Sequence, residues 1–166
     1  MKTLNKYINE GFLKNVGAGL NSLIDKWLKE NTNCKHYTIN PDGTIDVDSG
    51  IEITNKNITE FPDYVRFGKV NGDFNCSYCK LLKSLEGSPK EVGGSFICTC
   101  CKSLKSLEGA PKKVGGDFYC SGCNSLTSLE GSPKEVGGHF NCSHCNKQFT
   151  EEDVKKVSKV KRYIYI

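Results

Sequence analysis

The sequence contains no long hydrophobic run, and only one methionine, one tryptophan and five prolines occur among its 166 residues. No apolar stretch approaches the roughly 20 residues that a membrane-spanning helix needs. Residues 1–31 also lack the continuous apolar segment of an export signal, because charged residues interrupt it throughout. We therefore expect no membrane association and a reducing, cytoplasmic compartment in which thiols stay free.

Catalytic signatures are missing as well. The chain has no phosphate-binding Walker loop, no G-x-S-x-G nucleophile elbow and no H-E-x-x-H zinc motif. Its three histidines, His36, His139 and His144, do not combine with a nucleophile into a catalytic set. The net charge of +4 is too small to favour nucleic acid as a partner. The sequence predicts a protein that is not an enzyme and needs no cofactor.

What the sequence has in excess is cysteine, with ten residues, most of which belong to a 22-residue repeat. The block V-x-G-x-F-x-C-x-x-C begins at Val70, Val92, Val114 and Val136, and L-x-S-L-E-G-x-P follows at Leu82, Leu104 and Leu126. Phe96 and Cys98 are two positions apart, so both point to the same face of a short strand. The Glu-Gly-x-Pro segment then supplies turn chemistry. This predicts an α/β solenoid in which each repeat adds one strand and an irregular return.

The repeat resembles the leucine-rich repeat family. Phe74-x-Cys76-x-x-Cys79-x-x-Leu82 fits the family pattern with Phe and Cys in place of two leucines, and residues 51–62 fit it with Lys56 where Asn is usual. The resemblance covers residues 51 to about 148. It implies a curved parallel β stack of about five 22-residue rungs whose strands form a concave face, similar to short Cys-rich repeat proteins of bacteria and phages.

The two ends of the chain are typical of caps, which a solenoid needs to cover its last rungs. Residues 37–47 predict a hairpin around a Pro-Asp-Gly turn, and Thr150 begins a capping-box pattern with Val154, Val157 and Val160 at helical spacing. We expect a leader, helix and hairpin over 1–50, the solenoid over 51–148, and a helix and strand over 149–166. The apolar face of the N-terminal helix comprises Leu20, Leu23, Ile24, Trp27 and Leu28.

The four CxxC pairs admit two interpretations. Their spacing matches a zinc pattern, but any 22-residue repeat with Cys at two core positions produces the same spacing. Buried free Cys behaves as a small apolar residue, so we expect a core ladder and no bound metal. A structural zinc or redox module is the alternative. The residues concerned are Cys76, Cys79, Cys98, Cys101, Cys120, Cys123, Cys142 and Cys145.

The residues between the inward positions vary from repeat to repeat, which favours a surface that binds a protein partner. An exposed Ile97 near Tyr119 and Tyr78 is typical of such a patch, and His139 and His144 would flank the same strand. The predicted partner-binding residues are Asp73, Asn75, Tyr78, Ile97, Thr99, Asp117, Tyr119, His139, Asn141 and His144.

The first ten residues resemble the capsid-targeting leader of internal head proteins of large tailed phages. In those leaders a prohead protease cuts after Glu in an [LI]-x-E motif, which Ile8-Asn-Glu10 before Gly11 matches. The resemblance implies packaging in a phage head, cleavage between Glu10 and Gly11, and delivery to a bacterial host. The alternative is an ordinary amphipathic helix with Leu4, Tyr7, Ile8 and Phe12 on one face.

Overall fold

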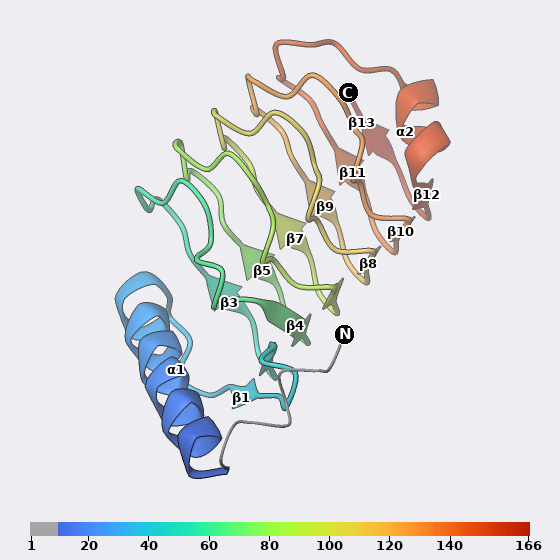
Figure 1. Ribbon diagram of the computed structural model, residues 1–166. Coiled ribbons are helices and arrows are strands. Elements are labelled where there is room, and N and C mark those ends of the chain that lie inside the picture. The colour runs from blue at the N-terminus through green and yellow to red at the C-terminus, as the bar shows by residue number, and fades with distance from the viewer. Residues whose placement is uncertain (1–9) are drawn as a thin grey trace, which may run out of the picture.

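A computed structural model describes residues 10–166, with side chains from residue 17, and shows a parallel β-solenoid (Figure 1). Residues 1–9 of the leader expected at residues 1–10 lie outside the described part, and Glu10 is the first residue of α1. Six turns stack along one axis, and each contributes a strand to two separate sheets. Sheet A comprises β1 (Thr38–Ile39), β2 (Ile45–Val47), β4 (Phe67–Val70), β6 (Glu91–Val92), β8 (Lys113–Val114), β10 (Glu135–Val136) and β12 (Lys159–Val160). Sheet B comprises β3 (Ile51–Glu52), β5 (Phe74–Asn75), β7 (Phe96–Ile97), β9 (Phe118–Tyr119), β11 (Phe140–Asn141) and β13 (Ile164–Tyr165).

The solenoid and its 22-residue period are confirmed, but the expectation of one strand per repeat is wrong. Each repeat has two strands, separated by a corner at the Gly-Gly pair, as in Glu91–Val92 followed by Phe96–Ile97. Strands of two residues are too short to display the alternation that reveals a strand in a sequence. The corner needs glycine because a Cβ on Gly115 would lie 2.1 Å from the carbonyl oxygen of Gly93 in the preceding turn.

The core is built from columns of identical residues that stack in register. Phe74 pairs with Phe96, Phe96 with Phe118, and Phe118 with Phe140, at ring-centroid separations of 5.3, 5.6 and 5.0 Å. All four rings are fully buried, and each contributes about 2–3 kcal/mol through burial of apolar surface. Because a turn has no hydrophobic interior of its own, these contacts between turns hold the stack together.

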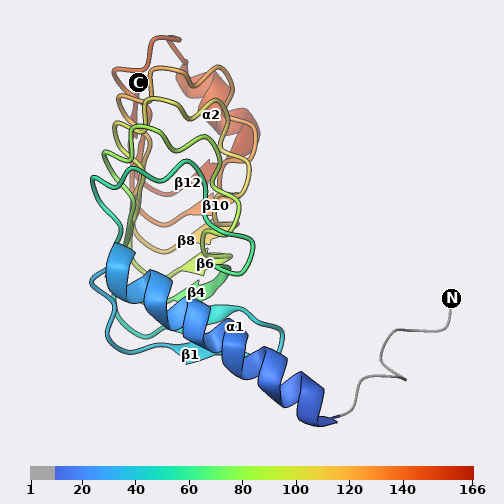
Figure 2. The same cartoon turned by 60° about the vertical axis from the view of Figure 1, so that its left-hand side comes forward.

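The N-terminal end is closed by α1 (Glu10–Asn31) and by a short hairpin. Figure 2 shows α1 crossing this end of the stack, with its first turns extending past the coils. Ile24, Trp27 and Leu28 are buried, but Leu20 and Leu23 are 36% and 50% exposed, so their expected burial is wrong. Ile24, the residue directly after Leu23, is fully buried, so the buried face of α1 begins there. The hairpin predicted at residues 37–47 is confirmed: β1 and β2 pair antiparallel.

At the C-terminal end, α2 (Glu151–Val157) has the predicted capping box between Thr150 and Asp153. Val160 was expected on this helix but lies in β12, because the backbone becomes extended at Ser158 (φ −141°). The segment after α2 therefore adds a sixth turn, and β12 and β13 extend the two sheets in register with β10 and β11.

Candidate functional site: the outer face of sheet B

The outer face of sheet B carries one residue from each strand, and the strand register places these residues side by side. Ile97 and Tyr119 occupy the middle of this outward column. Both are half-buried, so the sequence-based expectation of a freely exposed Ile97 is wrong. Neighbouring side chains about 4.8 Å away in the sheet cover part of each. The outward column is Glu52, Asn75, Ile97, Tyr119, Asn141 and Tyr165.

A hollow of about 290 Å³ opens at the N-terminal side of this face. Three predicted binding residues, Asp73, Asn75 and Ile97, line it together with Asn33 and the strand β3. The side-chain oxygen of Asn33 accepts the backbone N–H of Glu52 at 2.8 Å, which holds the segment after α1 beside β3. The hollow combines one apolar wall, at Ile97, with carboxylate and amide groups, a mixture suited to an inserted side chain of a partner.

The predicted residues Asp73, Asp117 and His139 form a second column at the start of the sheet-B strands. There their side chains accept backbone hydrogen bonds that connect adjacent turns. The side chain of Asp73 accepts the backbone N–H of Ser95 at 2.6 Å, and Asp117 accepts that of His139 at 2.7 Å. The side chains of Ser95 and His139 make the same kind of bond: they accept the backbone N–H groups of Asp117 and Tyr163 in the following turns, at 3.1 and 3.2 Å. This acceptor column ties each turn to the next. In the sequence, this column could have been recognised from the polar residue that directly precedes the Phe of each repeat.

Tyr119 connects the acceptor column with the outward column. Its hydroxyl donates to the carboxylate of Asp117 at 2.8 Å, and this hydrogen bond, followed by burial, raises the pKa of Tyr119. Burial acts to raise the pKa of Asp117, but the hydrogen bonds from the His139 backbone and from Tyr119 outweigh it, so the pKa is lowered. The phenol ring is therefore held in one orientation on the face.

Tyr78, Cys100 and His144 lie at the opposite end of the strands, where the chain turns. They adopt left-handed backbone conformations with φ of 60°, 59° and 57°, a geometry that favours glycine and is uncommon for other residues. Tyr78 is 52% exposed and remains available for contacts. His139 and His144 lie at opposite ends of β11, so the two histidines do not form a pair. Thr99, at the same end, accepts the hydroxyl of Ser121 at 3.5 Å.

The cysteines of the CxxC pairs line the interior, and all ten cysteines of the chain have free thiols. The second thiol of each pair donates to a main-chain carbonyl of the preceding turn: Cys101 to Cys76 and Cys123 to Cys98, both at 3.2 Å. Cys79 and Cys145 repeat the contact at 2.9 and 3.4 Å. Sequence reasoning anticipated burial but missed this donor role, which satisfies carbonyls in the dry core. Among the side chains of residues 17–166, no three of His, Cys, Asp or Glu are placed to hold a metal ion.

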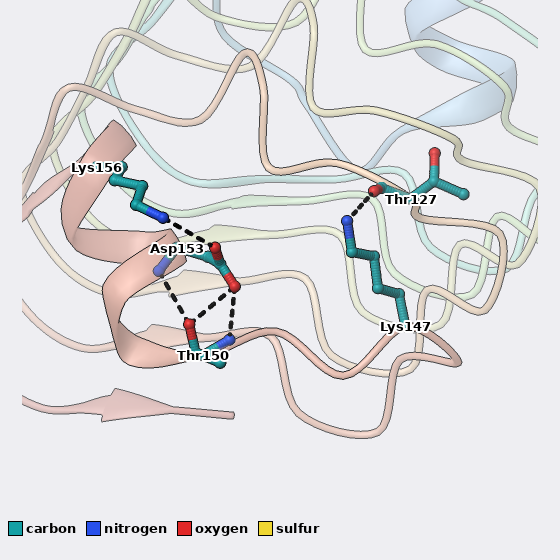
Figure 3. A network of polar contacts seen from close by, with 5 residues as sticks. All are labelled: Thr127, Lys147, Thr150, Asp153 and Lys156. Carbon is teal, nitrogen blue, oxygen red and sulfur yellow. Dashed lines mark hydrogen bonds and ion pairs between the residues drawn. The ribbon is translucent and has the colours of Figure 1, made fainter.

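A larger hollow of about 450 Å³ lies between α2 and the return segment Ser128–Gly131. Figure 3 shows its polar groups: Lys147 donates to the carbonyl oxygen of Thr127 at 2.7 Å, while Asp153 caps α2 through Thr150. Lys156 lies 3.6 Å from the carboxylate of Asp153. Because Lys147, Asp153 and Lys156 already have partners within the chain, the hollow is a weaker candidate for a partner site than the face of sheet B.

A comparison with known proteins found no match: no family model, no curated protein and no solved structure matches this chain. Across the part of the chain that the structure describes, no helix has the length and apolar character needed to cross a bilayer. The assignment of a site therefore depends on the geometry of the molecule itself.

Proposed function

We propose that the protein is a non-enzymatic binding module whose outer sheet-B face contacts a protein partner. The main support for this proposal is the difference between the inward and outward residues of the same sheet-B strands. The inward residues of β5, β7, β9 and β11 are all Phe, whereas the outward residues are Asn75, Ile97, Tyr119 and Asn141. Stacking alone would allow a uniform polar column. An Ile and a Tyr held side by side next to a hollow instead resemble the centre of an interface.

The mechanism would be contact with a preformed surface. The backbone of the face is held by the ladder of strands, and the Tyr119 ring is oriented by Asp117, so little conformational entropy is lost on binding. The leader resemblance adds a proposal about the setting: a phage-encoded protein, cut after Glu10, that acts in the cytoplasm of a bacterial host. Mass spectrometry of virions tests that setting, with a mature terminus at Gly11 as the supporting result and an intact Met1 as the contrary one.

Affinity capture from the host cell, followed by titration of the captured partner, tests the binding surface. Tyr119→Ala and Ile97→Asp should each weaken binding at least about tenfold, as expected for central interface residues. Lys113→Ala, on the outer side of sheet A, is the matched control and should leave the affinity unchanged. Circular dichroism establishes that all three variants stay folded. Equal affinity of the Tyr119→Ala and Lys113→Ala variants would place the partner on another surface.

A further inference from the structure

The two ends of the solenoid differ in how they are closed. At the N-terminal end, α1 covers the stack, and the backbone N–H of Asn33 donates to the carbonyl of Glu52 at 3.3 Å, so the edge of β3 has a partner. At the C-terminal end, β12 and β13 are the outermost strands of their sheets, and within the described residues no strand follows them. A strand edge of this kind is a template for one more strand.

Several large side chains at the C-terminal end of the described residues are exposed. Tyr163, Tyr165 and Ile166 are 70%, 47% and 57% exposed. Ile164 is only half-buried, although Phe140, its equivalent one turn earlier, is fully buried. Apolar side chains therefore lie exposed beside the last strands of the described residues, although α2 contacts β13.

The backbone groups at this end are arranged for hydrogen bonding. One turn earlier, the carbonyl of Val136 accepts the N–H of Lys161 at 3.0 Å, and the N–H of Phe140 donates to Tyr163 at 3.0 Å. By register, the carbonyl of Val160 and the N–H of Ile164 point in the same direction, beyond the last turn. An added turn would find an acceptor on sheet A and a donor on sheet B.

The outward column of sheet A indicates which charge an added strand would need. Its residues alternate in sign: Lys69 pairs with Glu91, Glu91 with Lys113, Lys113 with Glu135, and Glu135 with Lys159. Opposite charges on adjacent strands stabilise a sheet, and like charges destabilise it. Lys159 has a carboxylate on one side only, so an acidic residue is expected on its other side.

We propose that the C-terminal end binds an extended acidic segment of a partner protein, which adds a strand to the solenoid. The segment would place a carboxylate beside Lys159 and an aliphatic residue beside Val160, followed by a flexible corner and a large apolar residue over Ile164. A second copy of this chain fits less well, because its own end would bring Lys159, Lys161 and Arg162 against the same basic groups, while its other end is covered by α1. This surface is separate from the outer face of sheet B.

The chain itself supplies a probe with this chemistry: a fluorescent peptide with the sequence of residues 90–98, carrying Cys98→Ser to prevent oxidation. Fluorescence anisotropy with the full chain should show binding that is at least about tenfold tighter than for the same peptide with Glu91→Lys, and that weakens at high salt. In the full chain, Lys159→Glu should reverse this preference. Lys113→Glu, in the middle of the same column, should preserve it.

Two results would overturn the proposal. One is equal binding of the two peptides, or no binding of either one. The other is a concentration-dependent dimer in sedimentation experiments that Lys159→Glu leaves intact and that the acidic peptide cannot dissociate. That result would assign the end to a second copy of the chain.

Discussion

Buried thiols should make the stability of this protein fall steeply in alkaline solution. Cys76, Cys98 and Cys120 are fully buried. Thiol–thiol hydrogen bonding and then burial raise the pKa of Cys76 and of Cys98 well above the ordinary value of 9.0, and burial does so for Cys120. Each folded thiol therefore keeps its proton where the unfolded chain has lost it. The contribution of these groups is fully present below about pH 9 and declines as the pH rises toward the folded pKa.

The expected slope follows from the number of retained protons. One thiol that stays protonated only in the folded state lowers the free energy of unfolding by about 1.4 kcal/mol per pH unit. Three such thiols would give about 4 kcal/mol per pH unit above about pH 9. The lowered pKa of Cys123, the hydrogen-bond partner of Cys98, offsets part of this slope. Burial also raises the pKa of Cys79, Cys142 and Cys145, which adds to it, so the net slope stays on the order of 4 kcal/mol per pH unit. A domain with a stability of about 5–15 kcal/mol would then unfold within about one to four pH units.

Urea unfolding followed by circular dichroism, with a reductant present, measures this slope between about pH 8 and about pH 10.5. Cys120→Ala should reduce the slope by about 1.4 kcal/mol per pH unit, whatever its effect on absolute stability. Leu104→Ala is the control, because it removes a fully buried side chain that does not titrate and should leave the slope unchanged. A Cys120→Ala slope equal to that of the unmodified protein would refute the reasoning.

Three further predictions concern the corners, the acceptor column and the cysteines. Gly116→Ala should destabilise the fold by about 2 kcal/mol or more, because its Cβ would lie 2.7 Å from the Ser95 hydroxyl and 2.9 Å from the Gly94 backbone. Gly19→Ala, which meets nothing within 4 Å, should raise the stability of α1 by up to about 1 kcal/mol, and thermal melts compare the two. Asp117→Ala should cost about 1–3 kcal/mol, since the N–H of His139 and the hydroxyl of Tyr119 lose their acceptor, whereas Asp117→Asn, which keeps an acceptor oxygen, should cost less in the same melts. Elemental analysis of protein purified without chelator should find well below one zinc per chain, and a stoichiometric amount would reverse the assignment of the CxxC pairs to the core.

The sequence was most informative where one residue type recurs at a fixed interval. The period of the Phe, Cys and Leu columns predicted a solenoid and its core, because only stacked repeats bury identical residues against one another. The same reasoning failed at Leu23 and Val160, which carry the right spacing for a helix face. Whether such a residue is buried depends on where the helix meets the stack and where the chain turns, and neither property belongs to the local pattern.

The candidate site was predicted only in part. The outward position of Asn75, Ile97 and Tyr119 followed from strand alternation, but the half-burial of the last two depends on neighbours 22 residues away. Asp117 was predicted to contact a partner, and the structure shows in addition that it accepts a backbone N–H of the next turn. A single repeat cannot reveal this bond, because its donor and its acceptor belong to different turns.

By itself, the sequence determined that the chain stacks, with a period of 22 residues, and which side chains the stack buries. Those properties follow from composition and spacing, which set how much apolar surface each repeat must cover. Only the tertiary structure decided that each turn has two strands, that the thiols of the CxxC pairs serve as hydrogen-bond donors, and that α1 covers the N-terminal end of the stack while β12 and β13 are the outermost strands of the described residues at the other. These features arise from contacts between turns, whose geometry exists only once the turns are in register.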